Sequence, residues 1–247
     1  MCTLVILRRP LSPWPVVIAA NRDEMVDRPW QAPARHWPDR PEVVAGLDEL
    51  AHGSWLGVND FGVAAGILNR TNSLGPAPGA RSRGELVLEA LDHADAAAAA
   101  EALASLDPKA YRPFNLIIAD SRDGFWLRHA GGLEVRPLPP GLSMITSGDL
   151  DEASSPRLKR YRPRFAAAAP PDPDREAWGE WQDLLTDDGG SNDAGPLSAM
   201  CFRTPQGFAT VSSALLALPA PGRNRVPRFR FASHRPNAAP WGEVDLK

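Results

Sequence analysis

Two short stretches near the start of the chain carry side chains that could do chemistry. Cys2 follows the first methionine, and the tetrapeptide Asn21-Arg22-Asp23-Glu24 comes later. Removal of Met1 would place a thiol and a free α-amine on the same residue. An α-amine has a pKa of about 8, so it can accept a thiol proton near neutral pH, and a terminal amine is an established base for a side-chain nucleophile. The sequence therefore predicts a nucleophile that carries its own base, with Asp23 as a carboxylate that could hold the ammonium.

The apolar runs beside these residues predict the strands that must position them. Residues 3–7 and 16–20 are rich in aliphatic and β-branched side chains and are joined by a proline-rich turn. This pattern predicts a hairpin of central strands. The tetrapeptide is expected where the second strand ends, within reach of the first strand, although the sequence does not fix the register.

The remaining elements follow in blocks of strands, helices, strands, helices and strands, without the βαβ alternation of a parallel sheet. This order favours one α+β domain over residues 1–247. Residues 27–41 are rich in proline and are predicted to be irregular, either as a lid over a pocket or as a surface connection. The predicted helices are 85–91, capped by Ser82, then 95–106, a helix opened by Ser155-Pro156, and 175–185, followed by a mobile loop at 187–195. Residues 114–119, 125–129, 133–136 and 142–147 are predicted to form a meander of short antiparallel strands. The other predicted strands include 54–58, 63–69, 197–202, 208–218 and 228–232.

Composition excludes several classes of protein. The net charge of −3 gives no basic field for nucleic acid, and no run approaches the ~20 apolar residues of a membrane span. The first apolar run is too short for a secretory signal, which predicts a cytoplasmic protein. Cys2 and Cys201 are the two cysteines, with no spacing typical of zinc or c-type haem. Arginines cluster at 157–164 and 223–230, and we interpret them as solvated charge on a helix and a loop.

The combination of Cys2-Thr3 with Asn21-Arg22-Asp23-Glu24 closely resembles the NRDE family, also called the Transport and Golgi Organisation family. The resemblance extends over most of residues 1–150. Its further motifs are Gly57-Val58-Asn59-Asp60-Phe61-Gly62-Val63, Leu68-Asn69-Arg70-Thr71, Ser82-Arg83-Gly84 and Phe114-Asn115-Leu116.

That family is similar to N-terminal-nucleophile (Ntn) hydrolases of the penicillin V acylase and bile salt hydrolase type. The resemblance implies an αββα sandwich of two antiparallel sheets, with Cys2 as the nucleophile and its own α-amine as the base. It also implies that Asp23 orients the amine, that Asn21 precedes it with the same spacing, and that Asn69 helps to stabilise an oxyanion. A strand-end turn residue is an equally good interpretation of Asn69. The expected activity is hydrolysis of a small apolar amide, which requires no cofactor.

The chain departs from those acylases at three places. It has Ala19 and Ala20 where they carry an arginine, no asparagine near residues 146–148, and no arginine near residues 209–213. Arg22 is close by, but we expect it to point to the other face of the strand. The nucleophile and its orienting aspartate are thus present, while the rest of the amidase apparatus is not found at the expected positions.

These departures keep a non-catalytic alternative open. The NRDE resemblance also implies haem trafficking, or binding of acyl lipids or acyl-CoA, on an inert hydrolase fold. A haem carrier would need an axial ligand and an apolar slot. The candidate ligands are Cys2, His36, His52, His93, His129 and His234, and no spacing pairs the histidines.

Overall fold

The computed structural model describes residues 2–75, 77–190, 195–222, 225–234 and 241–247. The chain divides into two compact units: Met1–Arg28 with Pro140–Val244, and Pro29–Pro139 with Asp245–Lys247. The single domain predicted over residues 1–247 stays a prediction. No helix in the described part of the chain is long and apolar enough to cross a membrane.

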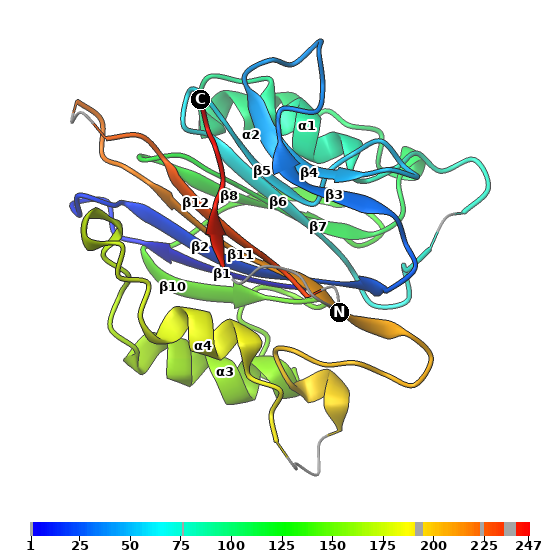
Figure 1. Cartoon of the computed structure of the whole chain (residues 1–247). Coiled ribbons are helices and arrows are strands. Elements are labelled where there is room, and N and C mark those ends of the chain that lie inside the picture. Colours follow the sequence, from blue (N-terminus) through cyan, green and yellow to red (C-terminus); the bar gives the residue numbers. More distant parts are fainter. Residues whose placement is uncertain (1, 76, 191–194, 223–224, 235–240) are drawn as a thin grey trace. The chain divides into compact units, whose positions relative to one another are not determined.

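The first unit contains a six-stranded antiparallel sheet in the order β10-β1-β2-β11-β12-β13 (Figure 1). Strands β1 (Thr3–Arg8) and β2 (Val16–Met25) form the predicted hairpin. The other strands are β10 (Gly141–Ile145), β11 (Phe208–Leu218), β12 (Arg228–Ser233) and β13 (Gly242–Glu243). Strand β2 runs past its predicted end because β11 pairs with it from Val16 to Met25. The Asn21–Glu24 tetrapeptide therefore lies inside a central strand and not after it.

Helices α3 (Pro156–Ala167) and α4 (Glu180–Thr186) belong to this unit. Helix α3 begins as predicted, because the Ser155 side chain accepts a hydrogen bond from the Leu158 amide and Pro156 fills the first turn. The helix continues through Pro163. The apolar side chains of α3 and α4 pack with one face of the sheet in a core that contains Val5, Val17, Ala19, Leu158, Tyr161, Phe165, Trp181, Leu185 and Leu215. This core defines the helical face of the sheet.

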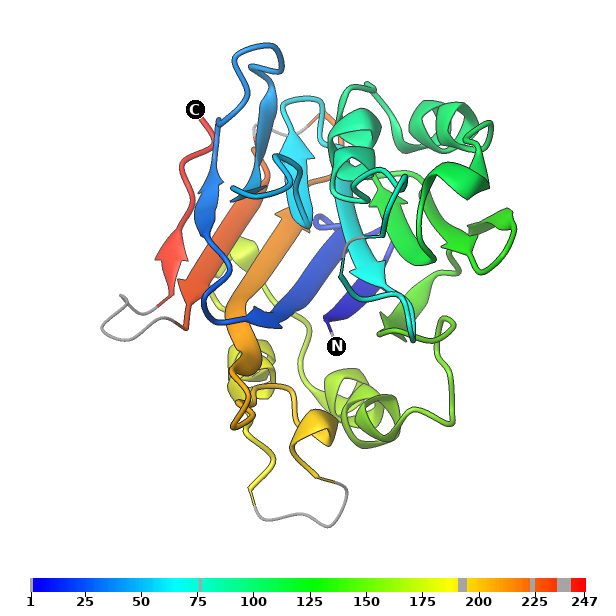
Figure 2. The same ribbon diagram turned by 90° about the vertical axis from the view of Figure 1, so that its right-hand side faces the viewer.

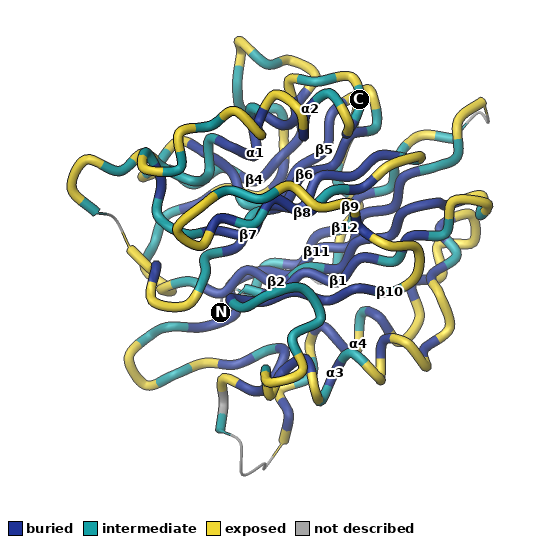
Figure 3. Tube along the Cα trace, turned by 180° about the vertical axis from the view of Figure 1, so that it is seen from behind, coloured by how far each residue is buried: buried dark blue, intermediate teal, exposed yellow. Residues whose placement is uncertain are grey.

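The second unit contains a seven-stranded antiparallel sheet in the order β3-β4-β5-β6-β7-β8-β9 (Figure 2). Its strands are β3 (Trp30–Ala34), β4 (Val43–Asp48), β5 (Leu56–Asn59), β6 (Ala64–Asn69), β7 (Phe114–Ala119), β8 (Gly124–His129) and β9 (Leu133–Pro137). Helices α1 (Glu85–Leu91) and α2 (Ala96–Leu103) share a core with this sheet. Most strand residues of each sheet are buried, as the dark blue parts of the tube in Figure 3 show.

The predicted cap of α1 is wrong. The residue before the helix is Gly84, which makes no side-chain cap bond, and Ser82 accepts a bond from the Gly84 amide instead. A Cβ built on Gly53 would lie 2.4 Å from the Gly84 carbonyl carbon, so the two backbones meet too closely for any side chain. This contact fixes the start of α1.

Three other predictions are corrected by strand pairing. Residues 30–34 form β3 despite Pro33, which edge strands tolerate because an amide there needs no partner. Strand β10 pairs with β1 and so does not continue the β7-β8-β9 meander. Residues 197–202 form no strand, and a short 3₁₀ turn lies at Pro196–Ser198. The loop predicted at 187–195 falls partly outside the described residues; within it, Asp187 is paired with Arg164.

Candidate functional site

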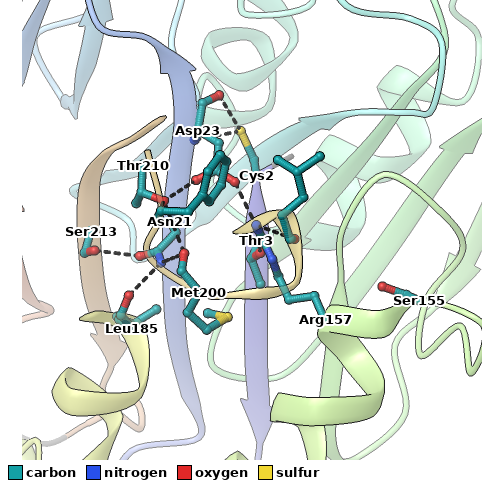
Figure 4. Close-up of polar contacts among 12 residues, drawn as sticks. Cys2, Thr3, Asn21, Asp23, Ser155, Arg157, Leu185, Met200, Thr210 and Ser213 are labelled. Carbon is teal, nitrogen blue, oxygen red and sulfur yellow. Dashed lines mark hydrogen bonds and ion pairs between the residues drawn. The ribbon is translucent and has the colours of Figure 1, made fainter. Parts of the chain in front are cut away.

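The Cys2 thiol lies against the backbone of Asp23. The Asp23 amide donates to Sγ over 3.3 Å, and Sγ donates to the Asp23 carbonyl over 3.5 Å (Figure 4). This contact follows from the hairpin register, which pairs Thr3 with Asn21 and leaves the next backbone groups of β2 open to the cysteine side chain. The structure thus brings Cys2 and Asp23 together as the sequence predicts, although the contact is made by the Asp23 backbone.

The Asp23 carboxylate is buried on the helical face of the sheet. One oxygen accepts a hydrogen bond from the Thr210 hydroxyl over 2.8 Å, and the other accepts one from Arg157 over 2.9 Å. The Arg157 and Asp23 side chains are 1% and 0% exposed, so their ion pair is shielded from water. A carboxylate held in this way has a fixed orientation.

Arg157 corrects the interpretation of the 157–164 arginines as solvated charge. Its guanidinium also donates to the Thr3 hydroxyl over 2.8 Å and to the Leu197 carbonyl over 3.0 Å, and it lies 5.3 Å from the Phe202 ring centre. A helical signal could have identified it. Arg157 stands one turn before Tyr161 on the buried face of α3, so it faces the core.

The Asn21 side chain links β2 by hydrogen bonds to helix α4 and to the segment around Met200. Its amide nitrogen donates to the Leu185 and Met200 carbonyls over 2.8 and 2.9 Å, and its oxygen accepts from Ser213 over 2.6 Å. Both amide hydrogens are therefore used within the protein. This geometry gives Asn21 a positioning role for β2, next to Asp23.

His234 extends this network. Its Nε2 lies 2.8 Å from the Ser213 hydroxyl, and because that hydroxyl donates to Asn21, Nε2 is the donor to Ser213. Burial lowers the pKa of His234 below 6.5, partly opposed by the Asp23 charge. The folded protein therefore favours the neutral ring.

This pKa shift predicts a pH dependence of stability. A lowered folded pKa contributes stability that is present above the unfolded value of about 6.5 and is lost as pH falls through the folded value. His234→Gln should therefore lose less stability than the unchanged protein between pH 7 and pH 5, as measured by urea unfolding at each pH. An identical pH slope in both proteins would show that His234 makes no such contribution.

Burial also raises the pKa of the Cys2 thiol above 9.0, and the Asp23 charge raises it further. The Asp23 amide and the Arg22 charge act in the opposite direction. The thiol is therefore protonated at neutral pH, and a nucleophilic role requires a base that removes its proton.

Asn69 and four of the five histidines belong to the second unit. Asn69 ends β6, where it pairs with Phe114, and its oxyanion role stays a prediction. His129 is buried with its ring nitrogens near the Tyr111 and Gly132 carbonyls, and His36 lies 2.8 Å from the Ala32 carbonyl. The structure thus groups Cys2, Asn21 and Asp23, and adds Arg157, Thr210, Ser213 and His234, which the sequence interpretation did not assign to this group.

Solved hydrolase structures are similar to this chain. Penicillin V acylase from Agrobacterium tumefaciens matches with a TM-score of 0.53 and 14% identity, covering 100% of this chain and 88% of that one. A variant of conjugated bile acid hydrolase from Clostridium perfringens matches with a TM-score of 0.57 and 11% identity over 99% of this chain and 92% of that one. An orthologue of N-acylethanolamine-hydrolyzing acid amidase from Caenorhabditis elegans gives 0.54 and 11% over 90% and 94%. These matches confirm the predicted fold class, an Ntn-hydrolase-like α+β fold with two antiparallel sheets.

Sequence comparison identifies the family. The Transport and Golgi organization protein 2 homologs of Bos taurus and Homo sapiens are 38% and 36% identical to this chain over 119 residues. The match covers 45% of this chain and 42% of each relative, so the chain spans less than half the length of the curated relatives it matches. The family model described as Transport and Golgi organisation 2 matches residues 1–200. The chain belongs to the Transport and Golgi organisation 2 family.

Proposed function

We propose that this protein is an N-terminal-cysteine hydrolase that cleaves a small apolar amide through Cys2. The observation that carries the proposal is the position of the Cys2 thiol on the backbone of Asp23, whose carboxylate is fixed by Arg157 and Thr210. A nucleophile needs a rigid support, and this one rests on a central strand pair.

The proposed reaction begins after Met1 has been removed. The neutral α-amine of Cys2 accepts the thiol proton, and the thiolate attacks the amide carbonyl carbon. The tetrahedral intermediate collapses to a thioester as the ammonium returns its proton to the leaving amine. The α-amine then takes a proton from water, the hydroxide attacks the thioester, and the acid product leaves as the thiol regains its proton. Asn69 is the proposed oxyanion donor.

The raised pKa of the Cys2 thiol sets one condition for this mechanism, since an internal base is needed at neutral pH. Two observations support the proposal. The fold is that of proteins named penicillin V acylase and conjugated bile acid hydrolase. The backbone of Asp23, whose carboxylate is predicted to orient the α-amine, contacts the thiol.

The α-amine provides the direct test. We expect the intact mass to show loss of Met1, and we expect the processed protein to release p-nitroaniline from short N-acyl p-nitroanilides. A non-cleavable N-terminal extension should lower this rate by about 10²-fold or more, the usual contribution of a general base. An extension that a site-specific protease removes to leave Cys2 first should restore the rate after cleavage. Equal activity with and without the extension would refute the self-base mechanism.

Binding of haem or an acyl lipid without catalysis stays the alternative proposal. Its haem form predicts a saturable Soret shift on titration with haemin, with Cys2 or a histidine as the axial ligand. A protein that shows this shift and no amide hydrolysis would favour the alternative. Cytoplasmic location also stays a prediction.

A further inference from the structure

Arg22 lies across the hairpin from Cys2. Because Thr3 pairs with Asn21 in the antiparallel register, Cys2 stands opposite the next residue of β2, which is Arg22. Side chains alternate along a strand, so Arg22 points to the sheet face opposite to the one that carries Asn21 and Asp23. The sequence interpretation predicted this direction for Arg22. The register adds that its position is directly beside the cysteine.

The burial of Arg22 strengthens the attraction between its guanidinium and a nearby anion. The residue is 6% exposed. Its neighbours across the strand pairs are Ser212 on β11 and Cys2 beyond the start of β1. Glu24 lies 3.8 Å from its Nη2, at the long end of the range for an ion pair, and Glu24 also lies 3.6 Å from Arg28. A guanidinium shielded from water attracts an anion more strongly than an exposed one.

The chemistry of the thiol agrees with this placement. The Arg22 charge is among the influences that lower the pKa of the Cys2 thiol. A positive charge that acts on the sulfur can also act on an anionic group of a molecule held at the sulfur. Guanidinium groups bind carboxylate and phosphate oxygens through paired N–H donors.

We propose that Arg22 is a specificity-determining residue that binds a carboxylate or phosphate oxygen of a ligand whose reacting carbon lies at Cys2. The inference rests on the proposed function, since it takes Cys2 as the reacting group. It narrows the proposed substrate, a small amide, to one that also carries an anionic group close to the scissile bond.

Alkylation of Cys2 by two matched reagents tests this inference. Iodoacetate and iodoacetamide react with the same thiolate and differ in the charge of the group beside the reacting carbon. The ratio of their rate constants therefore cancels changes in thiol pKa and access. In a Cys201→Ser background, with modification of Cys2 followed by mass spectrometry, Arg22→Gln should lower the iodoacetate-to-iodoacetamide ratio about five- to tenfold.

Matched variants separate this effect from a general loss of charge. Arg28→Gln removes the other arginine that contacts Glu24 and should leave the ratio unchanged. Arg22→Lys keeps the positive charge, so the ratio should stay close to that of the unchanged protein. Glu24→Gln removes a competing carboxylate and should raise the ratio. A ratio that is the same in Arg22→Gln and Arg28→Gln would overturn the proposal.

Protection experiments identify the anion. Benzoate or inorganic phosphate should slow the reaction of Cys2 with neutral iodoacetamide in a saturable manner, and Arg22→Gln should abolish this protection. Protection by benzoate alone indicates a carboxylate ligand, and protection by phosphate alone indicates a phosphate ligand. Absence of protection by both, or equal protection in Arg22→Gln, contradicts the proposal. Hydrolysis does not enter these measurements, so their failure is distinguishable from failure of the proposed function.

Discussion

Replacing Arg157 with methionine should lower the free energy of unfolding by about 3–5 kcal/mol, the cost of leaving one partner of a buried ion pair without the other. The Asp23 carboxylate would keep its bond from Thr210 but would remain buried without the guanidinium of Arg157. Thr3 and the Leu197 carbonyl would also lose a donor. Urea unfolding followed by circular dichroism measures the loss.

Two variants show whether the effect comes from the buried pair. Arg164→Met removes an arginine from the same helix whose partner is Asp187, and because the Arg164 side chain is 46% exposed, its loss should cost less than about 1 kcal/mol. Asp23→Asn in the Arg157→Met background removes the buried charge that has lost Arg157 and should recover part of the stability. If Arg157→Met and Arg164→Met lower the free energy of unfolding by the same amount, the buried ion pair between Arg157 and Asp23 stabilises the unit no more than an exposed ion pair does.

Cys2→Ala should reduce amide hydrolysis by about 10³-fold or more, because the proposed reaction has no second nucleophile to form the acyl intermediate. The fold should be retained, since within the described residues the thiol forms its hydrogen bonds with the backbone of Asp23 and holds no other side chain in place. Initial rates on the most reactive N-acyl p-nitroanilide, with circular dichroism of the same sample, measure both quantities.

Cys201→Ser is the matched control, since it changes the other cysteine of the same unit and should leave hydrolysis unchanged. A trapped thioester gives a second readout: a processed protein mixed with substrate and quenched in acid should gain the acyl mass on Cys2. Hydrolysis that continues at the same rate in Cys2→Ala would exclude Cys2 as the nucleophile.

Much of the fold could be predicted because local patterns carry it. The aliphatic runs predicted β1, β6, β7, β11 and β12, and Ser155-Pro156 predicted the start of α3. The predictions failed where distant strands decide the outcome. The tetrapeptide lies within β2 because β11, which comes much later in the chain, supplies its hydrogen-bond partners. Strand β10 likewise pairs with β1, a strand far from it in sequence, and not with its neighbour in the chain, β9.

The sequence by itself determined the pair at the centre of the site. Cys2 and Asp23 were identifiable because Cys2 directly precedes β1, Asp23 lies on β2, and a short turn joins these two strands, so the distance between them is set locally. Tertiary structure alone decided what holds Asp23 and what faces Cys2. Arg157, Thr210 and Ser213 are separated from Asn21 and Asp23 by 134 to 192 residues, and only the packing of α3 and β11 against β2 brings them together. The physical reason is that a buried carboxylate must be paired, and the chain supplies the partner from whichever element the core places beside it.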